Sequence, residues 1–160
     1  MLIRAATHQD HAAVWQMLKP VFRSGETYAI DPDISEKDAL NYWTGADAGC
    51  FVIEQDGTIF GTYYLKTNAQ GGGAHVCNCG FVTGPTAQGK GVARAMLVDA
   101  LRRAKETGYK AMQFNFVLAN NARAIDIWQR AGFNTVGRLP KAFNHPKDGM
   151  IDALVMFKTL

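Results

Sequence analysis

The stretch Gly80–Arg94 reads GFVTGPTAQGKGVAR and joins a predicted strand to a predicted helix through a glycine-rich loop. N–H groups in the first turn of a helix have no partner within the helix, and the helix dipole adds about half a positive charge there. Gly89 and Gly91 let a ligand approach the backbone, while Lys90 and Arg94 add positive charge. This arrangement predicts a phosphate site. The simpler alternative is a tight turn that needs glycines only for its geometry.

Hydrophobic periodicity on both sides of this loop predicts strands alternating with helices. The predicted strands cover residues 2–6, 51–54, 58–66, 74–83, 111–117, 133–137 and 150–158. The predicted helices cover residues 8–22, a short segment capped by Ser35 that stops by Gly45, residues 89–105, and a segment from Asn120 or Asn121 through Ala131. We find no repeat and no linker, so residues 1–160 are expected to form one α/β domain with a mixed sheet and helices on its faces.

The composition, with 48% hydrophobic and 19% charged residues, is that of an ordinary globular protein. A net charge of +3 without a basic run argues against nucleic-acid binding. No apolar stretch approaches the roughly 18 residues of a membrane span, and the N-terminus turns polar too early for a signal peptide. These features predict a cytoplasmic protein without a membrane partner, in which the three cysteines are reduced.

Two polar segments have a functional and a simpler interpretation. His75, Cys77 and Cys79 alternate along a predicted strand and span about 13 Å, too far for one zinc ion with ligands at about 2.0–2.3 Å. We therefore expect no metal, and the two cysteines are predicted to pack in the core. Five acidic residues between Glu26 and Asp38 form either a solvated loop or an acidic rim that attracts a cationic substrate.

The loop is compatible with two phosphate-binding families. Gly84–Lys90 fits the beginning of a P-loop, but position 91 is a glycine without the hydroxyl that holds magnesium, which argues against a nucleotide-binding P-loop protein. Gln88-x-x-Gly91-x-Ala93 instead resembles the Q/R-x-x-G-x-G/A loop of the GNAT family of N-acetyltransferases. Asn121–Phe133 is similar to the N-x-x-A-x-x-L-Y-x-x-x-G-F run of the same family.

The resemblance covers nearly the whole chain. Gly25–Tyr28, Met112–Asn115 and Asp152–Met156 are similar to a bacterial subgroup related in outline to phosphinothricin acetyltransferases. The resemblance to the GNAT family implies a central, mostly antiparallel sheet of about six to seven strands flanked by about four helices. It also implies acetyl-CoA as co-substrate. By this resemblance the pantetheine would pair with Val82 and Thr83, and Asn121 and Trp128 would lie near the pantetheine or the thioester. The pyrophosphate would be held by Gln88, Gly89, Lys90, Gly91, Val92, Ala93 and Arg94.

Two positions depart from the family pattern. Where many members have a tyrosine that protonates the leaving thiolate, this chain has Trp128, whose indole is no acid near pH 7 and which we expect mainly to pack. Where some members have a glutamate as general base, this chain has Asn78, which can orient a water but cannot take a proton. His75, His145 and Glu26 are the other candidates for a base, although each histidine alone is more typical of a surface residue.

The resemblance predicts an N-acetyltransferase that transfers an acetyl group directly from acetyl-CoA to a primary amine of a small molecule or amino acid. Thr27 and Tyr28 lie in the region that resembles the acceptor side of related enzymes, and we expect them to contact the acceptor. The alternative from another class is a non-catalytic acyl-CoA sensor, favoured by Asn78 and Trp128. Dimers are common in the family, so a homodimer stays open, although no feature of the sequence requires one.

Overall fold

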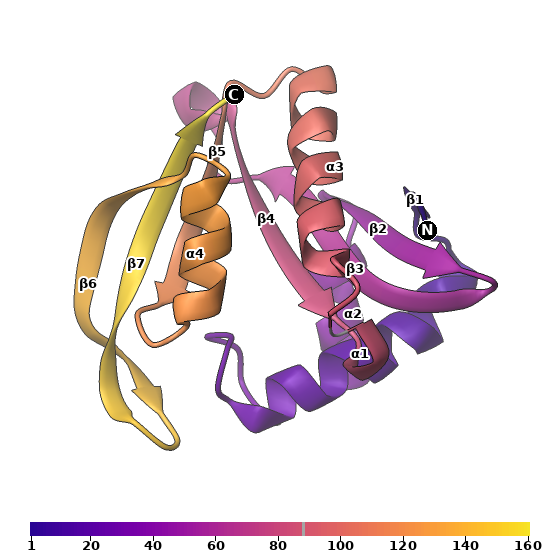
Figure 1. The fold of residues 1–160 in the computed structure, drawn as a ribbon, viewed down its shortest axis with the longest axis horizontal. Coiled ribbons are helices and arrows are strands. Elements are labelled where there is room, and N and C mark those ends of the chain that lie inside the picture. The colour runs from indigo at the N-terminus through magenta and orange to yellow at the C-terminus, as the bar shows by residue number, and fades with distance from the viewer. Residues whose placement is uncertain (88) are drawn as a thin grey trace.

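The computed structural model describes residues 1–87 and 89–160, and within these ranges the chain forms seven strands and four α-helices (Figure 1). The strands are β1 (Leu2–Ala5), β2 (Ala48–Gln55), β3 (Thr58–Thr67), β4 (Val76–Thr83), β5 (Ala111–Leu118), β6 (Asn134–His145) and β7 (Gly149–Thr159). The helices are α1 (His11–Ser24), α2 (Glu36–Thr44), α3 (Val92–Glu106) and α4 (Ala122–Arg130). The predicted α/β fold is confirmed. None of the described helices is long and apolar enough to cross a membrane.

The strands form one sheet in the order β1-β2-β3-β4-β5-β7-β6. β4 and β5 pair in parallel, and the other neighbouring pairs are antiparallel, as predicted. The predicted hairpin between β2 and β3 turns at Asp56 and Gly57, whose φ angles of 52° and 75° suit a two-residue hairpin turn. The sheet therefore contains a single described parallel pair, at its centre.

Helices cover both faces of the sheet (Figure 1), and each face has its own hydrophobic core. On one face, α3 and α4 pack against a cluster that includes Tyr63, Cys77, Cys79 and Met112. On the other face, α1 and α2 pack against Val52, Tyr64 and Val82. Cys77 and Cys79 are 0% and 5% exposed, which confirms that they pack in the core.

Several predicted boundaries differ from the structure, among them those of β6 and α3. β6 runs to His145 instead of ending at Gly137, because β7 supplies antiparallel partners as far as His145↔Gly149, through two register shifts that local propensity does not reveal. α3 begins at Val92 instead of Gly89, because Gly89 and Gly91 adopt left-handed φ angles of 77° and 72°. The predicted cap of α2 by Ser35 is confirmed, since its Oγ accepts the N–H of Asp38 at 3.1 Å.

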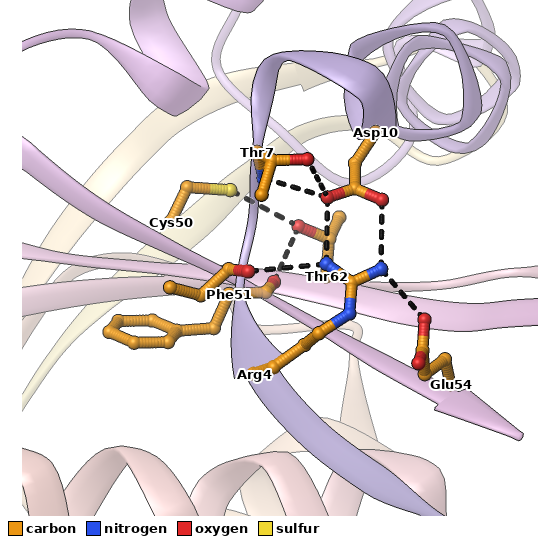
Figure 2. A network of polar contacts seen from close by, with 8 residues as sticks. Arg4, Thr7, Asp10, Cys50, Phe51, Glu54 and Thr62 are labelled. Carbon is orange, nitrogen blue, oxygen red and sulfur yellow. Dashed lines mark hydrogen bonds and ion pairs between the residues drawn. The ribbon is translucent and has the colours of Figure 1, made fainter.

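A polar clasp fastens the N-terminal strand to the start of α1 (Figure 2). The Arg4 guanidinium donates to both carboxylate oxygens of Asp10, at 2.8 and 2.9 Å, and to Glu54 at 2.7 Å. Asp10 also accepts the N–H and the hydroxyl of Thr7. The hydrogen bond from Arg4 is the largest influence on the Asp10 carboxyl and lowers its pKa well below the usual 3.8, although burial acts in the opposite direction. The clasp lies at the β1 edge of the sheet. It fixes the orientation of the beginning of α1 relative to this edge.

Candidate active site

The centre of the sheet opens into a fork, defined as the segments of β4 after Cys77 and of β5 after Met112. The two strands pair only at Val76↔Ala111 and Cys77↔Met112. The Asn78 side-chain amide donates to the carbonyl of Gln113 at 2.9 Å. In an uninterrupted parallel ladder, that carbonyl would accept the N–H of Cys79 instead. Asn78 thus ends the pairing and lies at the vertex of the fork.

The orientation of Asn78 is set by a second hydrogen bond. Its Oδ1 accepts the hydroxyl of Tyr64 at 2.9 Å, and the side chain is only 7% exposed. The Tyr64 ring can reach it because position 80 is a glycine, where a Cβ atom would lie 2.5 Å from the ring. Burial is the main reason why the pKa of the Tyr64 phenol is raised, so this hydroxyl stays protonated and donates.

Alternate residues of β4 present their backbone groups to the fork. Asn68 N–H donates to Val76 O, and Gly84 N–H donates to Phe60 O, so the even-numbered residues of β4 face β3. The N–H and C=O groups of Cys79, Phe81 and Thr83 therefore point into the fork, whereas those of Val82 point toward β3.

Tyr28 occupies one of these fork-facing positions. Its hydroxyl donates to Phe81 O at 2.9 Å and accepts Phe81 N–H at 3.1 Å. The loop between α1 and α2 thereby reaches into the place that a neighbouring strand would take. Burial raises the pKa of the Tyr28 phenol, so the hydroxyl remains neutral.

The fork contains a cleft of about 320 Å³. Aromatic side chains from both faces of the sheet form much of its wall, and none of the described residues that line it carries a charge. The lining residues are Thr27, Tyr28, Ala29, Ile30, Tyr42, Tyr64, Asn78, Cys79, Gly80, Phe81, Phe114, Asn115, Phe116, Val117, Leu118, Asn121, Ala124 and Trp128. The predicted residues Thr27, Tyr28, Asn78, Asn121 and Trp128 are thus brought together.

The glycine-rich loop lies at the N-terminal end of α3, where β4 ends. Gly91 is the N-cap residue, and Ala95 N–H makes the first helical bond to its carbonyl, at 3.0 Å. The N–H groups of Val92, Ala93 and Arg94 precede that bond, so they have no acceptor within the helix. A Cβ atom at Gly89 or Gly91 would meet nothing within 4 Å, so the backbone there is open to a ligand. Gln88 lies outside the described residues.

The basic side chains of this loop differ in their surroundings. Lys90 Nζ lies 4.4 Å from the centre of the Phe60 ring, and Arg94 is exposed on the first turn of α3. Both are close enough in sequence to the helix N-terminus to add positive charge at the open backbone. An anion bound there would meet N–H groups and cations together.

α4 and its N-cap residue contribute Asn121, Ala124 and Trp128 to the cleft lining. The Asn121 side chain caps the helix by accepting the N–H of Ala124 at 3.2 Å. Trp128 packs against Phe81 and Phe114, with ring centroids 5.3 and 4.8 Å apart. The Trp128 ring thus forms part of the apolar wall, next to the open edge of β4.

Three candidates for a general base lie outside the cleft lining. His75 is exposed before β4 begins. His145 is the last residue of β6, and its Nδ1 accepts the N–H groups of Lys147 and Asp148 at 3.2 and 3.1 Å, which stabilises the β6–β7 turn. The Glu26 carboxylate pairs with Lys147 Nζ at 2.5 Å, which joins the α1–α2 loop to that turn.

Sequence reasoning missed Tyr42, Tyr64 and Asn115 as cleft residues. Alternation along residues 58–66 does place Tyr64 and Lys66 on one face of a strand, but it does not indicate which face meets the fork. In the described residues, no group of three or more His, Cys, Asp or Glu side chains could hold a metal ion.

Comparison with known proteins assigns this architecture to one family. Residues 11–133 match the acetyltransferase (GNAT) family. The N-acetyltransferase aca1 of Schizosaccharomyces pombe is 27% identical over 148 residues, which cover 82% of this chain and 71% of that protein.

Two solved structures show the same fold. A GCN5-related N-acetyltransferase from Kribbella flavida superposes with a TM-score of 0.94 at 34% identity, covering 99% of this chain and 97% of that one. The yncA protein of Salmonella typhimurium, solved with its cofactor acetyl-CoA, has a TM-score of 0.87 at 21% identity, covering 100% and 94% of the two chains. The resemblance predicted from the sequence is confirmed.

Proposed function

Because the chain belongs to the acetyltransferase (GNAT) family, we propose that it transfers an acetyl group from acetyl-CoA directly to a primary amine of a small molecule or amino acid. The observation that carries the proposal is the fork beside the glycine-rich loop. It combines a strand edge with free backbone groups, a neutral cleft and an open helix N-terminus, all in one domain.

The residues at the open edge fit acetyl-CoA. The pyrophosphate would accept the free N–H groups at the start of α3, beside Lys90 and Arg94, because these groups combine hydrogen bonding with positive charge. The pantetheine amides would pair with the fork-facing backbone of Thr83, as an added strand does. Trp128 and Phe81 would pack against the apolar part of the arm.

In the proposed reaction, the neutral amine nitrogen attacks the thioester carbonyl carbon, and the carbon–sulfur bond breaks. The amine loses a proton, and the thiolate gains one from solvent. A fork-facing N–H of β4 would polarise the carbonyl oxygen, as an oxyanion hole does. The N–H of Cys79 is closest to the fork vertex, whereas Tyr28 already occupies that of Phe81.

The chemistry of the cleft limits how the amine becomes neutral. An alkylamine with a pKa near 10.4 lies about 3.4 units from neutrality at pH 7, which costs about 4.6 kcal/mol. The described lining holds no histidine or carboxylate, so a water held by Asn78 would carry the proton away. Alignment of the two substrates can lower the barrier by about 7 kcal/mol or more, so turnover does not require a strong base.

Two measurements test this function. Isothermal titration with acetyl-CoA should show binding, and its absence at hundreds of micromolar would overturn the proposal. Release of free CoA thiol with a panel of amines should then identify acceptors. Binding without thiol release from any amine would favour the acyl-CoA sensor instead.

The variant Asn78→Ala separates acetyl-CoA binding from acetyl transfer. It removes the hydrogen bonds to Tyr64 and Gln113, so thiol release should fall while acetyl-CoA still binds at the intact α3 N-terminus. Asn134→Ala is a matched control, since Asn134 is exposed at the start of β6 and is not among the residues that line the cleft. An unchanged rate in Asn78→Ala would exclude a role for Asn78 in proton removal.

A further inference from the structure

We propose that Lys66 binds a carboxylate of the acceptor, so that the acceptor is an amino acid or another amine that carries an acid group. This proposal rests on the proposed acetyl transfer and names the substrate class for the same cleft. Four features support it: the position of Lys66, the charges around it, its remaining donors and its distance from the fork vertex.

Lys66 is not itself a lining residue of the cleft, but its ammonium group packs against two rings that are. Its Nζ is 4.4 Å from the centre of the Tyr42 ring and 4.7 Å from that of the Tyr64 ring, and both rings line the cleft. The two rings hold the ammonium group by cation–π attraction and limit its movement. Tyr64 is only 4% exposed, so one side of this cation is kept away from water.

The charge of Lys66 is not neutralised by a described carboxylate. No aspartate or glutamate oxygen among the described residues lies within 4.0 Å of its Nζ. The lining is neutral, and Glu26 is paired with Lys147. The acceptor end of the cleft therefore has a positive potential, which favours an anionic group and disfavours a second cation.

Lys66 is the charged hydrogen-bond donor on this part of the sheet, because the neighbouring donors are neutral side-chain amides. Gln113 donates to Asn115 at 2.9 Å, and Asn115 donates to Asn68 at 2.7 Å. These bonds use part of the hydrogen-bonding capacity of the amides. An ammonium group has three donors, and contact with ring faces leaves donors free for a carboxylate, which forms stronger bonds with a charged donor than with a neutral one.

The strand register places Lys66 next to the residue at the fork vertex. Lys66 and Asn78 are register partners on neighbouring strands, which places their Cβ atoms about 4.5–5.5 Å apart. In an α-amino acid the amine and the carboxylate share one carbon atom. A carboxylate bound by Lys66 would thus keep the amine on the same face of the sheet as Asn78, where the proposed reaction begins.

The experiment compares matched acceptors. Thiol release is measured with each of the common amino acids and with its decarboxylated amine, for the unaltered protein and for Lys66→Met. We expect the unaltered protein to prefer the acids, and Lys66→Met to lose about 10- to 100-fold in kcat/KM for acids with little change for the amines. Lys66→Arg should restore part of the activity on acids because it keeps the charge.

Two controls keep a structural effect apart from this role. Lys105→Met changes an exposed lysine on α3 and should leave both kinds of acceptor unaffected. Isothermal titration of Lys66→Met should give unaltered affinity for acetyl-CoA. Equal losses on acids and amines, preference of the unaltered protein for amines, or binding without turnover of any acid would overturn the assignment of Lys66. Failure of the unaltered protein to bind acetyl-CoA would instead overturn the proposed function on which it rests.

Discussion

The proposed cosubstrate end, at the glycine-rich loop, and the proposed acceptor end, in the cleft, are built in different ways. The cosubstrate end comes from one continuous stretch, in which the edge of β4 leads through Gly89 and Gly91 to the start of α3. The proposed acceptor end lies in a cleft that is assembled from the α1–α2 loop, α2, β3, β4, β5 and α4. The first presents backbone groups to a ligand, and the second presents side chains.

This difference has a consequence for specificity. Backbone N–H groups at a helix N-terminus bind any phosphate and depend on glycine geometry more than on a particular side chain. Side chains from separate elements can change one at a time while the fold remains. We therefore expect substitutions at the cosubstrate end to abolish binding, and substitutions at the acceptor end to change selectivity.

Gly91→Asp should have the largest effect. It adds a carboxylate at a residue with a φ angle of 72°, beside the open backbone, so charge repulsion should weaken acetyl-CoA binding by roughly 100-fold. Isothermal titration measures the loss. Gly108→Asp is the control, because Gly108 also has a positive φ, 92°, but follows the other end of α3. Equal affinity in both variants would contradict a phosphate site at Gly91.

Arg4→Met should affect stability alone, since the residues labelled in Figure 2 are not among those that line the cleft. It leaves Asp10, whose side chain is 9% exposed, without its guanidinium partner, and should lower the free energy of unfolding by about 1–3 kcal/mol. Thermal unfolding at pH 7 measures this loss. A change in acetyl-CoA affinity would show that the clasp is coupled to the cleft.

The same clasp predicts a pH dependence. The pKa of Asp10 is lower in the folded protein than its usual 3.8, mainly through the hydrogen bond from Arg4. The stabilisation is therefore complete above pH 3.8 and is lost as the pH falls toward the folded value. The difference in stability between the unaltered protein and Arg4→Met should shrink below pH 4, and a constant difference would argue against an ionised pair.

Tyr28→Phe should have a smaller and opposite effect on binding. The hydroxyl occupies the N–H and C=O groups of Phe81, and its loss should free them for acetyl-CoA, giving about 3- to 10-fold tighter binding. Tyr42→Phe is the control, since its hydroxyl reaches only Tyr64 among the described residues. Weaker binding in Tyr28→Phe would mean that the hydroxyl stays in place and contacts the ligand.

Lys147→Met should have the smallest effect. It removes the surface pair with Glu26 that joins the α1–α2 loop to the β6–β7 turn, and exposed pairs contribute little. The KM for an acceptor should change by less than about fivefold, and the melting temperature should stay the same. A large change in selectivity would show that this pair shapes the acceptor end.

Local signals in the sequence predicted most of the fold. Asp56-Gly57 indicated the hairpin, Ser35 the cap of α2, and the apolar stripe of residues 92–104 the long helix, because each depends on residues close in sequence. The extension of β6 could not be predicted in this way. Its pairing depends on β7 and passes through irregular register.

The sequence by itself determined the glycine-rich loop and the family. The reason is that this loop depends on residues that are neighbours in the chain and that together form a single turn. Only the tertiary structure decided that Tyr28 bonds to Phe81 and that Lys66 packs against two tyrosines that line the cleft. The tertiary structure also shows that the cleft lining does not include His75, His145 or Glu26. The physical reason is that these side chains come from elements far apart in the chain, and their distances follow from strand order and packing.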